Sequence, residues 1–244
     1  MNDVTLGVDI GTGSSKAGLV DTDGRLLAVA RAHHRITHPQ PGWSESNPDD
    51  WLTSASTAVT HVLSQAPDVA VLAIGLSGQM HGVVLVDPAG RPVRPAVLWS
   101  DRRAGSELHR LRTRLGATAD RLANPIVTGM AGPTIAALAR TEPDSLEVAE
   151  WTLQPKDWVR LQLTGQIATD PSDASATLLW DAPPRSQTPS ANRSASTREG
   201  VTAAERTASG TAGGAPQAFG RISANVPPKA LWPPLIVGLK RSSS

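Results

Sequence analysis

Residues 4–32 contain three apolar runs typical of β-strands, joined by two short segments that contain glycine. The runs are VTLGVDI (4–10), SKAGLVD (15–21) and RLLAVARA (25–32), and the second connection, DTDG, is a strong turn signal. Connections this short join neighbouring strands in antiparallel order. The pattern therefore predicts a three-stranded meander whose first turn, GTGS, consists of small residues.

A helix and further strands follow the meander. SNPDDWLTSASTAVTHVLSQ predicts a helix in which Asn47 is the N-cap, Pro48 takes the first position and two acidic residues lie at the positive end of the helix dipole. VAVLAIGLS (69–77) predicts a buried strand that joins the sheet in parallel, because the helix forms a crossover. GVVLVD (82–87) and PVRPAVLW (92–99) predict two more strands. This order is typical of a layered α/β domain with a mixed sheet.

Glycine marks the ends of later elements but forms no common nucleotide motif. RRAGSELHRLRTRLG and PKDWVRLQLTG predict helices that end at Gly116 and Gly165. The chain contains neither a Walker loop that ends in Gly-Lys-Ser/Thr nor a GxGxxG sequence that opens a helix. The glycine-rich turn between the first two strands therefore differs from the phosphate loops of the common nucleotide-binding folds.

The composition changes near residue 182. Residues 182–244 contain eight basic and two acidic residues, whereas residues 1–181 contain 15 basic and 20 acidic ones. The later segment is rich in Ala, Ser, Thr, Pro and Gly, and such a composition buries too little apolar surface to offset the entropy of ordering. We expect a folded domain over residues 1–181 and a low-complexity, disordered tail over 182–244. A frameshift would explain the abrupt change.

Several classes of protein are disfavoured by the composition of the whole chain. The net charge of +1 gives no sign of nucleic-acid binding, and the absence of cysteine excludes disulfides. No apolar run has the length of a membrane span, and the first residues lack a secretory signal pattern. We expect a cytoplasmic protein that binds neither nucleic acid nor membrane. The oligomeric state is not readable from the sequence.

Six segments, in order over residues 4–181, resemble the FGGY carbohydrate kinases, and most closely the xylulokinases. They are VDIGTGSSKAGLVD, GWSESNPDDW, AIGLSGQMHGVVLVD, RPAVLWSDRR, PKDWVRLQLTG and TDPSDASATLLWD. The resemblance implies an actin-like ATPase (ribonuclease H-like) domain with a mixed sheet, which is the first lobe of a two-lobe sugar kinase. It also implies phosphate transfer from ATP, with Mg²⁺, to D-xylulose, giving D-xylulose 5-phosphate. Another pentulose or a polyol is the alternative substrate.

The first of these segments resembles the phosphate-binding hairpin of that fold. Glycine lets a backbone approach phosphate oxygens without a Cβ in the way, while hydroxyl and ammonium groups add donors. The resemblance implies that Asp9 is a catalytic carboxylate that holds Mg²⁺ through water. The phosphate contacts that it implies are Gly11, Thr12, Gly13, Ser14 and Lys16. Without the other five segments, a plain glycine-rich hairpin with a capping Asp9 explains the pattern equally well.

Two other segments carry the expected sugar contacts. SGQMHG lies between two predicted strands, where α/β proteins commonly bind ligands, and the resemblance implies that Met80 and His81 contact the ketose. In LWSDRR, Trp99 matches a tryptophan that lines the sugar pocket of related kinases, with Asp101 accepting hydroxyl hydrogen bonds and Arg103 holding Asp101. The alternative places Trp99 in the core and makes Asp101 a helix cap. The sequence does not distinguish the two.

The similarity ends at LLWD, near residue 181. In the family, the second half supplies an adenosine-binding loop and the Asp that acts as general base. TAGGAP (211–216) contains glycines, but no Asp follows it. We therefore expect little or no kinase activity from this chain alone. A non-catalytic sugar-binding or regulatory half-domain is the alternative.

Two histidines have the spacing of paired metal ligands on a helix. His34 and His38 are four residues apart, but the stretch is predicted to be a strand followed by a loop, where this spacing does not bring two side chains together. We do not expect a metal site there.

Overall fold

The computed structural model describes residues 2–122 and 124–179, so the expected tail over residues 182–244 lies outside the described residues. The main sheet has the strand order β3-β2-β1-β5. Its strands are β1 (Asn2–Ile10), β2 (Ser14–Asp21), β3 (Leu26–His33) and β5 (Val69–Gly78). The β1–β2 and β2–β3 pairs are antiparallel, and β5 pairs with β1 in parallel. The predicted meander and the predicted parallel strand are both confirmed.

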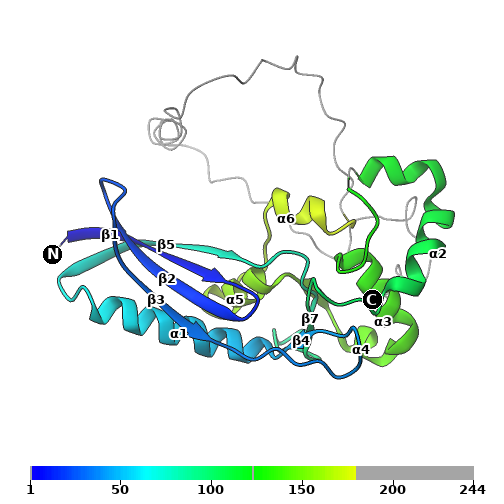
Figure 1. Cartoon of the computed structure of the whole chain (residues 1–244), viewed down its shortest axis with the longest axis horizontal. Coiled ribbons are helices and arrows are strands. Elements are labelled where there is room, and N and C mark those ends of the chain that lie inside the picture. The colour runs from blue at the N-terminus through cyan, green and yellow to red at the C-terminus, as the bar shows by residue number, and fades with distance from the viewer. Residues whose placement is uncertain (1, 123, 180–244) are drawn as a thin grey trace, which may run out of the picture.

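Helix α1 (Pro48–Ser64) covers one face of the meander (Figure 1). It begins as predicted, because the side chain of Asn47 accepts a hydrogen bond from the N–H of Asp49 and Pro48 opens the helix. Alternate residues of β1 point at the helix and are buried, and the opposite side chains are exposed or half-buried. The core between them contains Val4, Leu6, Val8, Ile10, Leu19, Trp51, Ala55, Ala58 and Val62.

Strand β5 is not buried, contrary to the sequence-based expectation. Leu72 is 66% exposed and Ile74 is 58% exposed. The reason is positional: α1 packs against β1, β2 and β3, whereas β5 lies at the edge of the main sheet. An apolar run thus identified the strand correctly but did not identify its neighbours.

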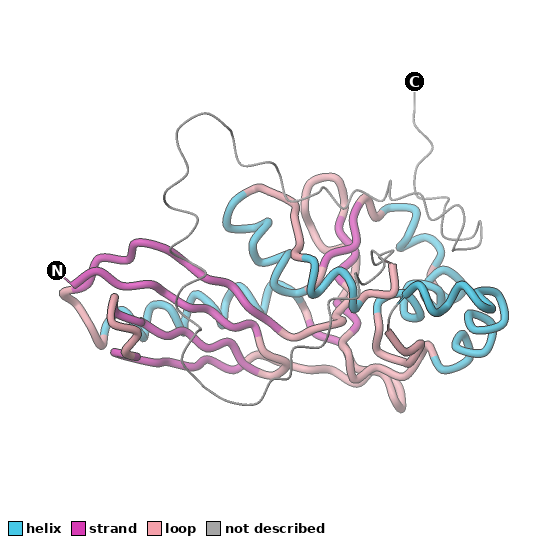
Figure 2. The backbone as a smooth tube through the Cα atoms, turned by 90° about the horizontal axis from the view of Figure 1, so that it is seen from above, coloured by secondary structure: helices cyan, strands magenta, loops and turns pink. Residues whose placement is uncertain are grey.

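Most of the remaining helices gather at the end of the body away from the N-terminus (Figure 2). Three short strands are β4 (Glu45–Ser46), β6 (Val84–Val86) and β7 (Ala96–Val97), and β8 (Trp151–Leu153) pairs with β6. The helices are α2 (Gly105–Leu115), the 3-10 helix η1 (Gly116–Leu122), α3 (Ala131–Thr141), α4 (Pro143–Val148), α5 (Pro155–Thr164) and α6 (Pro171–Ala176). Within the residues that the structure describes, no helix is both long and apolar enough to cross a membrane.

The strand predicted over 92–99 is much shorter in the structure. Pro92 and Pro95 each lack a backbone N–H, so only Ala96 and Val97 form regular strand β7. The two predicted helix ends are confirmed, because α2 ends at Gly116 and α5 ends at Gly165, and Gly165 adopts the left-handed helical conformation. Trp158 of α5 meets Trp51 of α1 edge to face, with ring centroids 6.4 Å apart. This contact joins α5 to the main core.

Candidate functional site

The β1–β2 turn, residues 11–14, is tight and tolerates no side chain at its first position. The N–H of Gly11 donates to the carbonyl oxygen of Ser14 at 3.1 Å. A Cβ on Gly11 would lie 2.8 Å from that oxygen, which is closer than real Cβ contacts come, and 3.8 Å from Oδ2 of Asp9. Glycine is therefore required here by close approach.

The carbonyl groups of this turn are tied to other side chains. The carbonyl oxygen of Gly11 accepts a hydrogen bond from Nε2 of Gln79 at 3.4 Å. His34 donates to the next two carbonyl oxygens: its ring nitrogen Nε2 bonds to Thr12 O at 3.0 Å, and its backbone N–H bonds to Gly13 O at 3.2 Å. Among residues 2–122 and 124–179, the N–H groups of Thr12 and Gly13 have no acceptor. Unpaired backbone donors in a turn are a ready site for an anion.

Asp9 on β1 and Lys16 on β2 are cross-strand neighbours close to the β1–β2 turn. The antiparallel register pairs Asp9 directly with Lys16, so both side chains lie on the face opposite α1. Oδ1 of Asp9 accepts the hydroxyl of Ser77 at 2.9 Å. Lys16 is exposed and forms no ion pair with any of the described residues. A positive and a negative group thus flank the unpaired N–H groups.

The segment Gln79–Gly82, here called loop 79–82, lies directly against this turn. The N–H of Gln79 donates to the carbonyl of Ile10 at 2.8 Å, and the N–H of His81 donates to Oε1 of Gln154 at 3.1 Å. Gly82 packs on Pro155 so closely that a Cβ would lie 2.6 Å from its ring. Loop 79–82, which connects β5 to β6, is therefore held between the end of β1 and the start of α5.

Two side chains of loop 79–82 have buried polar atoms without a hydrogen-bond partner among the described residues. They are Oε1 of Gln79 and Nδ1 of His81. Buried polar atoms are nearly always paired, so an orphan atom marks a place for water or a ligand. Burial lowers the pKa of His81, although Asp173 acts to raise it, so the ring is neutral at pH 7. Met80, next to it, is 57% exposed.

Trp99 links the strand end after β7 to the β1–β2 turn. Its indole N–H donates to the hydroxyl of Thr12 at 3.0 Å, and 49% of the residue is exposed. The alternative that placed Trp99 in the core is therefore wrong. The backbone of Gly129 packs directly against the carbonyl group of Trp99. Gly129 has a φ of +83°, and there is no room for a Cβ between it and that carbonyl. No local signal in the sequence marks Gly129 as part of this site.

Asp101 and Arg103 belong to a buried ionic network. Asp101 is 2% exposed, and its two carboxylate oxygens accept hydrogen bonds from the N–H of Ser44 and from Arg103. Arg103 also pairs with Glu45 at 2.6 Å and stacks on Trp43, 3.8 Å from the ring centre. With both oxygens occupied, Asp101 has a structural role. The expected sugar contact by Asp101, held by Arg103, is corrected accordingly.

The chain is similar to known proteins over most of these residues. Residues 4–191 match the model of the N-terminal domain of the FGGY family of carbohydrate kinases. The chain belongs to the FGGY family. Together with the mixed sheet, this membership gives the chain the actin-like ATPase fold that was expected.

Three relatives show how much of an FGGY kinase is present. The xylulose kinase of Escherichia coli (strain K12) is 34% identical over 176 residues, which cover 72% of this chain and 36% of that protein. The xylulose kinase of Streptomyces rubiginosus is 36% identical over 181 residues, covering 72% and 37%. The crystal structure of a xylulose kinase from Brucella ovis matches with a TM-score of 0.70 and 36% identity, covering 73% and 37%. The chain thus spans little more than a third of the length of these relatives.

A largely buried lysine with three carboxylates, Lys156, lies beside Gly78 at the end of β5 in this FGGY domain. Nζ of Lys156 is 2.8 Å from Asp157, 2.7 Å from Asp170 and 3.0 Å from Asp173. Burial alone would lower the pKa of Lys156, but the three carboxylates outweigh it and hold the pKa above its ordinary value. Burial likewise acts to raise the pKa of Asp170, and Lys156 and Ser172 hold it below its usual range. Sequence analysis missed this cluster, because it combines α5 with the start of α6.

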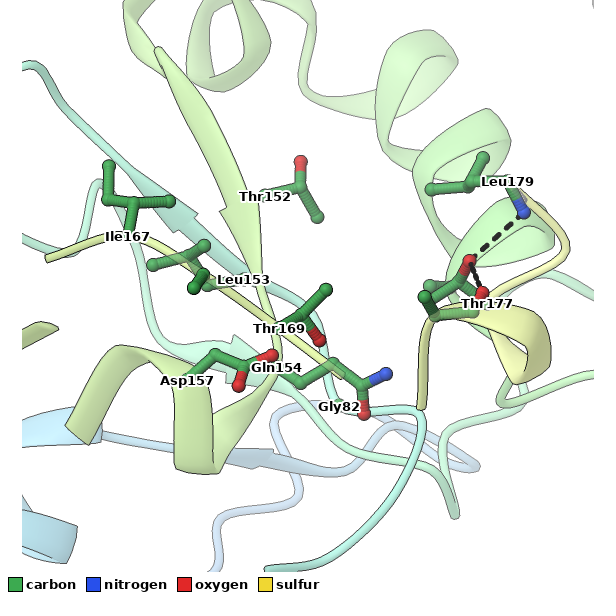
Figure 3. A pocket seen from close by; sticks show the side chains of 12 residues that line it. Gly82, Thr152, Leu153, Gln154, Asp157, Ile167, Thr169, Thr177 and Leu179 are labelled. Carbon is green, nitrogen blue, oxygen red and sulfur yellow. Dashed lines mark hydrogen bonds between the residues drawn. The ribbon is translucent and has the colours of Figure 1, made fainter. Parts of the chain in front are cut away.

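A small cavity lies beside Gly82. Figure 3 shows Gln154 and Thr169 near Gly82, with Thr177 across the cavity. Its volume is about 60 Å³. That volume holds a few water molecules and is below the ~150 Å³ of a cavity that accepts a benzene-sized ligand. Asp157 of α5 and Ala131 of α3 also line it.

Proposed function

We propose that these residues form the sugar- and phosphate-binding lobe of a kinase that transfers phosphate from ATP to D-xylulose. Family membership supports the reaction class, since FGGY proteins are carbohydrate kinases. The relatives named as xylulose kinases, together with the SGQMHG segment, support the ketose. The product is D-xylulose 5-phosphate.

One observation carries the proposal: the β1–β2 hairpin is hydrogen-bonded both to Trp99 and to Gln79, the chain neighbour of Met80. Gln79 bonds to Ile10 and Gly11, and Trp99 bonds to Thr12. Phosphoryl transfer depends mainly on holding the acceptor hydroxyl in line with the phosphate. Direct contact between the two groups of residues provides that alignment.

The residues of the turn fit the phosphates of a nucleotide. Gly11 has no side chain in the way, and the N–H groups of Thr12 and Gly13 are unpaired among the described residues. Lys16 offers an exposed ammonium group, and the hydroxyl of Ser14 lies at the start of β2. We propose that these groups bind phosphate oxygens and that Asp9 holds Mg²⁺ through water. When bound, Mg²⁺ neutralises charge on the phosphate.

The residues of the sugar side have complementary roles. Met80 and Trp99 are exposed apolar groups that cover the carbon face of the ketose. Nδ1 of the neutral His81 takes a sugar hydroxyl as its missing partner. The general base and the adenosine contacts belong to the second lobe of the family's architecture. In this proposal, closure of that lobe over the site excludes water.

Replacing His81 with alanine is expected to weaken D-xylulose binding about tenfold, because one hydrogen bond from a sugar hydroxyl to a buried acceptor is lost. The measurement is calorimetric titration of the full chain with D-xylulose and, in a second arm, with glycerol. The control is His109→Ala, since His109 is exposed on α2. Equal affinities for the two variants would remove His81 from the site, and tighter binding of glycerol would change the proposed substrate.

Residues 1–244 are expected to turn over D-xylulose about 10²- to 10⁴-fold more slowly than the Escherichia coli xylulose kinase, because no Asp follows residue 181 to act as the general base. A coupled assay of ADP release measures this, with the Escherichia coli relative as the reference. Comparable turnover would show that a base lies elsewhere in this chain.

A further inference from the structure

His34 lies between the β1–β2 turn and helix α1, and both of its ring nitrogens are hydrogen-bonded. Nε2 is 3.0 Å from the carbonyl oxygen of Thr12, and Nδ1 is 3.0 Å from the hydroxyl of Ser54 on α1. The backbone N–H of His34 donates to Gly13 O at 3.2 Å. One residue thus holds two consecutive carbonyl groups of the turn.

The partners fix the tautomer of His34 and the direction of the hydrogen bonds. A carbonyl oxygen only accepts, so Nε2 carries the hydrogen, and Nδ1 of the neutral ring must then accept from Ser54. Ser54 is 3% exposed, and its oxygen in turn accepts from the hydroxyl of Ser15, which is fully buried, at 2.7 Å. The result is a directed chain from Ser15 through Ser54 and His34 to Thr12.

The orientation of the turn's peptide planes follows from these bonds. In a trans peptide the C=O of one residue and the N–H of the next point in opposite directions, and no described peptide bond is cis. Because the carbonyls of Thr12 and Gly13 point to His34, the N–H groups of Gly13 and Ser14 point away from it. On that side of the turn, away from His34, the N–H of Gly13 has no acceptor among the described residues.

We propose that His34 is a positioning residue that fixes the β1–β2 turn in the orientation in which its N–H groups bind the phosphates of a nucleotide. The inference rests on the proposed function for its ligand. The hydrogen bonds from His34 to the carbonyls of Thr12 and Gly13, here called the brace, are a property of the fold itself. His34 contacts no phosphate and acts only through Thr12 and Gly13. His38, four residues further along the chain, does not contribute to this role, because its Nδ1 bonds to the carbonyl oxygen of Trp43.

The charge state of the ring suits this role at neutral pH. Burial lowers the pKa of His34, while the carbonyls of Thr12 and Gly11 and the carboxylate of Asp50 act to raise it and His33 acts to lower it. The ring of His34 is therefore uncharged at pH 7. Protonation would give Nδ1 a hydrogen of its own, and Ser54 would have to turn its hydroxyl to the carbonyl of Trp51, 3.1 Å away.

The test compares His34→Ala and His34→Gln with His38→Ala in the full chain. Glutamine keeps an N–H donor at the place of Nε2, and His38 is an exposed neighbour with its own carbonyl partner. The first readout is amide exchange of Gly11, whose bond to Ser14 closes the turn. We expect exchange about tenfold faster in His34→Ala, a smaller increase in His34→Gln and no change in His38→Ala. Unchanged exchange in His34→Ala overturns the brace.

The second readout is the affinity for MgATP, measured by titration with inorganic triphosphate as a parallel probe. We expect about tenfold weaker binding in His34→Ala, with partial rescue in His34→Gln. Faster exchange with unaltered affinity overturns the positioning role. If the unmodified chain binds neither probe, the proposed function fails, and Gly11 exchange still decides the brace. The ring-nitrogen NMR shifts of the unmodified chain give a check without mutation, because a hydrogen on Nδ1 at pH 7 overturns the directed chain.

Discussion

Replacing Lys156 with methionine is expected to lower the free energy of unfolding by ~3 kcal/mol at pH 7, because three carboxylates are left without their cation. Asp157 and Asp173 are largely buried, with side chains 5% and 19% exposed, whereas Asp170 is 39% exposed. Water screens Asp170 in part, so the expected value is at the low end for a broken buried pair. Denaturant unfolding of the two proteins measures it.

The loss should depend on pH with a definite sign. The pKa of Asp170 is lowered in the folded chain, so its contribution is present above the ordinary carboxyl pKa of about 4 and is lost as the pH falls further. The pKa of Lys156 is raised, so its contribution is complete below its ordinary pKa of about 10.4 and is lost in stronger base. The two proteins should therefore converge in acid. Arg91→Met, which breaks a pair between Asp87 and an arginine whose side chain is 78% exposed, is the control and should change the free energy of unfolding much less.

Local signals in the sequence were enough to predict the strands of the main sheet and helices α1, α2 and α5, whereas helices α3, α4 and α6 and strands β4 and β8 were not predicted. The cap at Asn47 and the stops at Gly116 and Gly165 depend on residues within one helical turn, and the structure confirms all three. The parallel pairing of β5 follows from its helical crossover. Its exposure could not be predicted, because burial depends on which elements cover a strand and not on the strand's own composition.

The residues of the candidate site also fall into two groups, those that a continuous motif reveals and those that only tertiary packing brings together. The glycine-rich turn and loop 79–82 are continuous segments, so their motifs were visible, although their ligands remain a prediction. His34 was considered only beside His38, its neighbour in the sequence, yet its partner Ser54 is 20 residues away. Lys156 and Asp173 meet only when α5 packs against the start of α6. Contacts of this kind depend on tertiary packing, which one sequence does not reveal.

Replacing Gly129 with alanine is expected to lower the free energy of unfolding by roughly 3 kcal/mol or more. At a φ of +83° any Cβ is strained, which costs about 1–2 kcal/mol, and forcing the Cβ against its neighbours adds about 1–3 kcal/mol. The added atom would meet the backbone of Trp99, which cannot rotate away as the tip of a side chain could. The indole hydrogen bond from Trp99 to Thr12 should therefore break with the loss of stability.

Gly24→Ala separates the two costs of the Gly129 substitution. Gly24 has a φ of +81°, but no atom lies within 4 Å of its added Cβ, so it carries the backbone strain alone. We expect Gly24→Ala to cost about 1 kcal/mol and to leave the indole N–H resonance of Trp99 unshifted. If Gly129→Ala costs no more than Gly24→Ala, Gly129 does not hold Trp99 in place. Because Trp99 is the proposed link between sugar and phosphate, that result would also require another residue to align them.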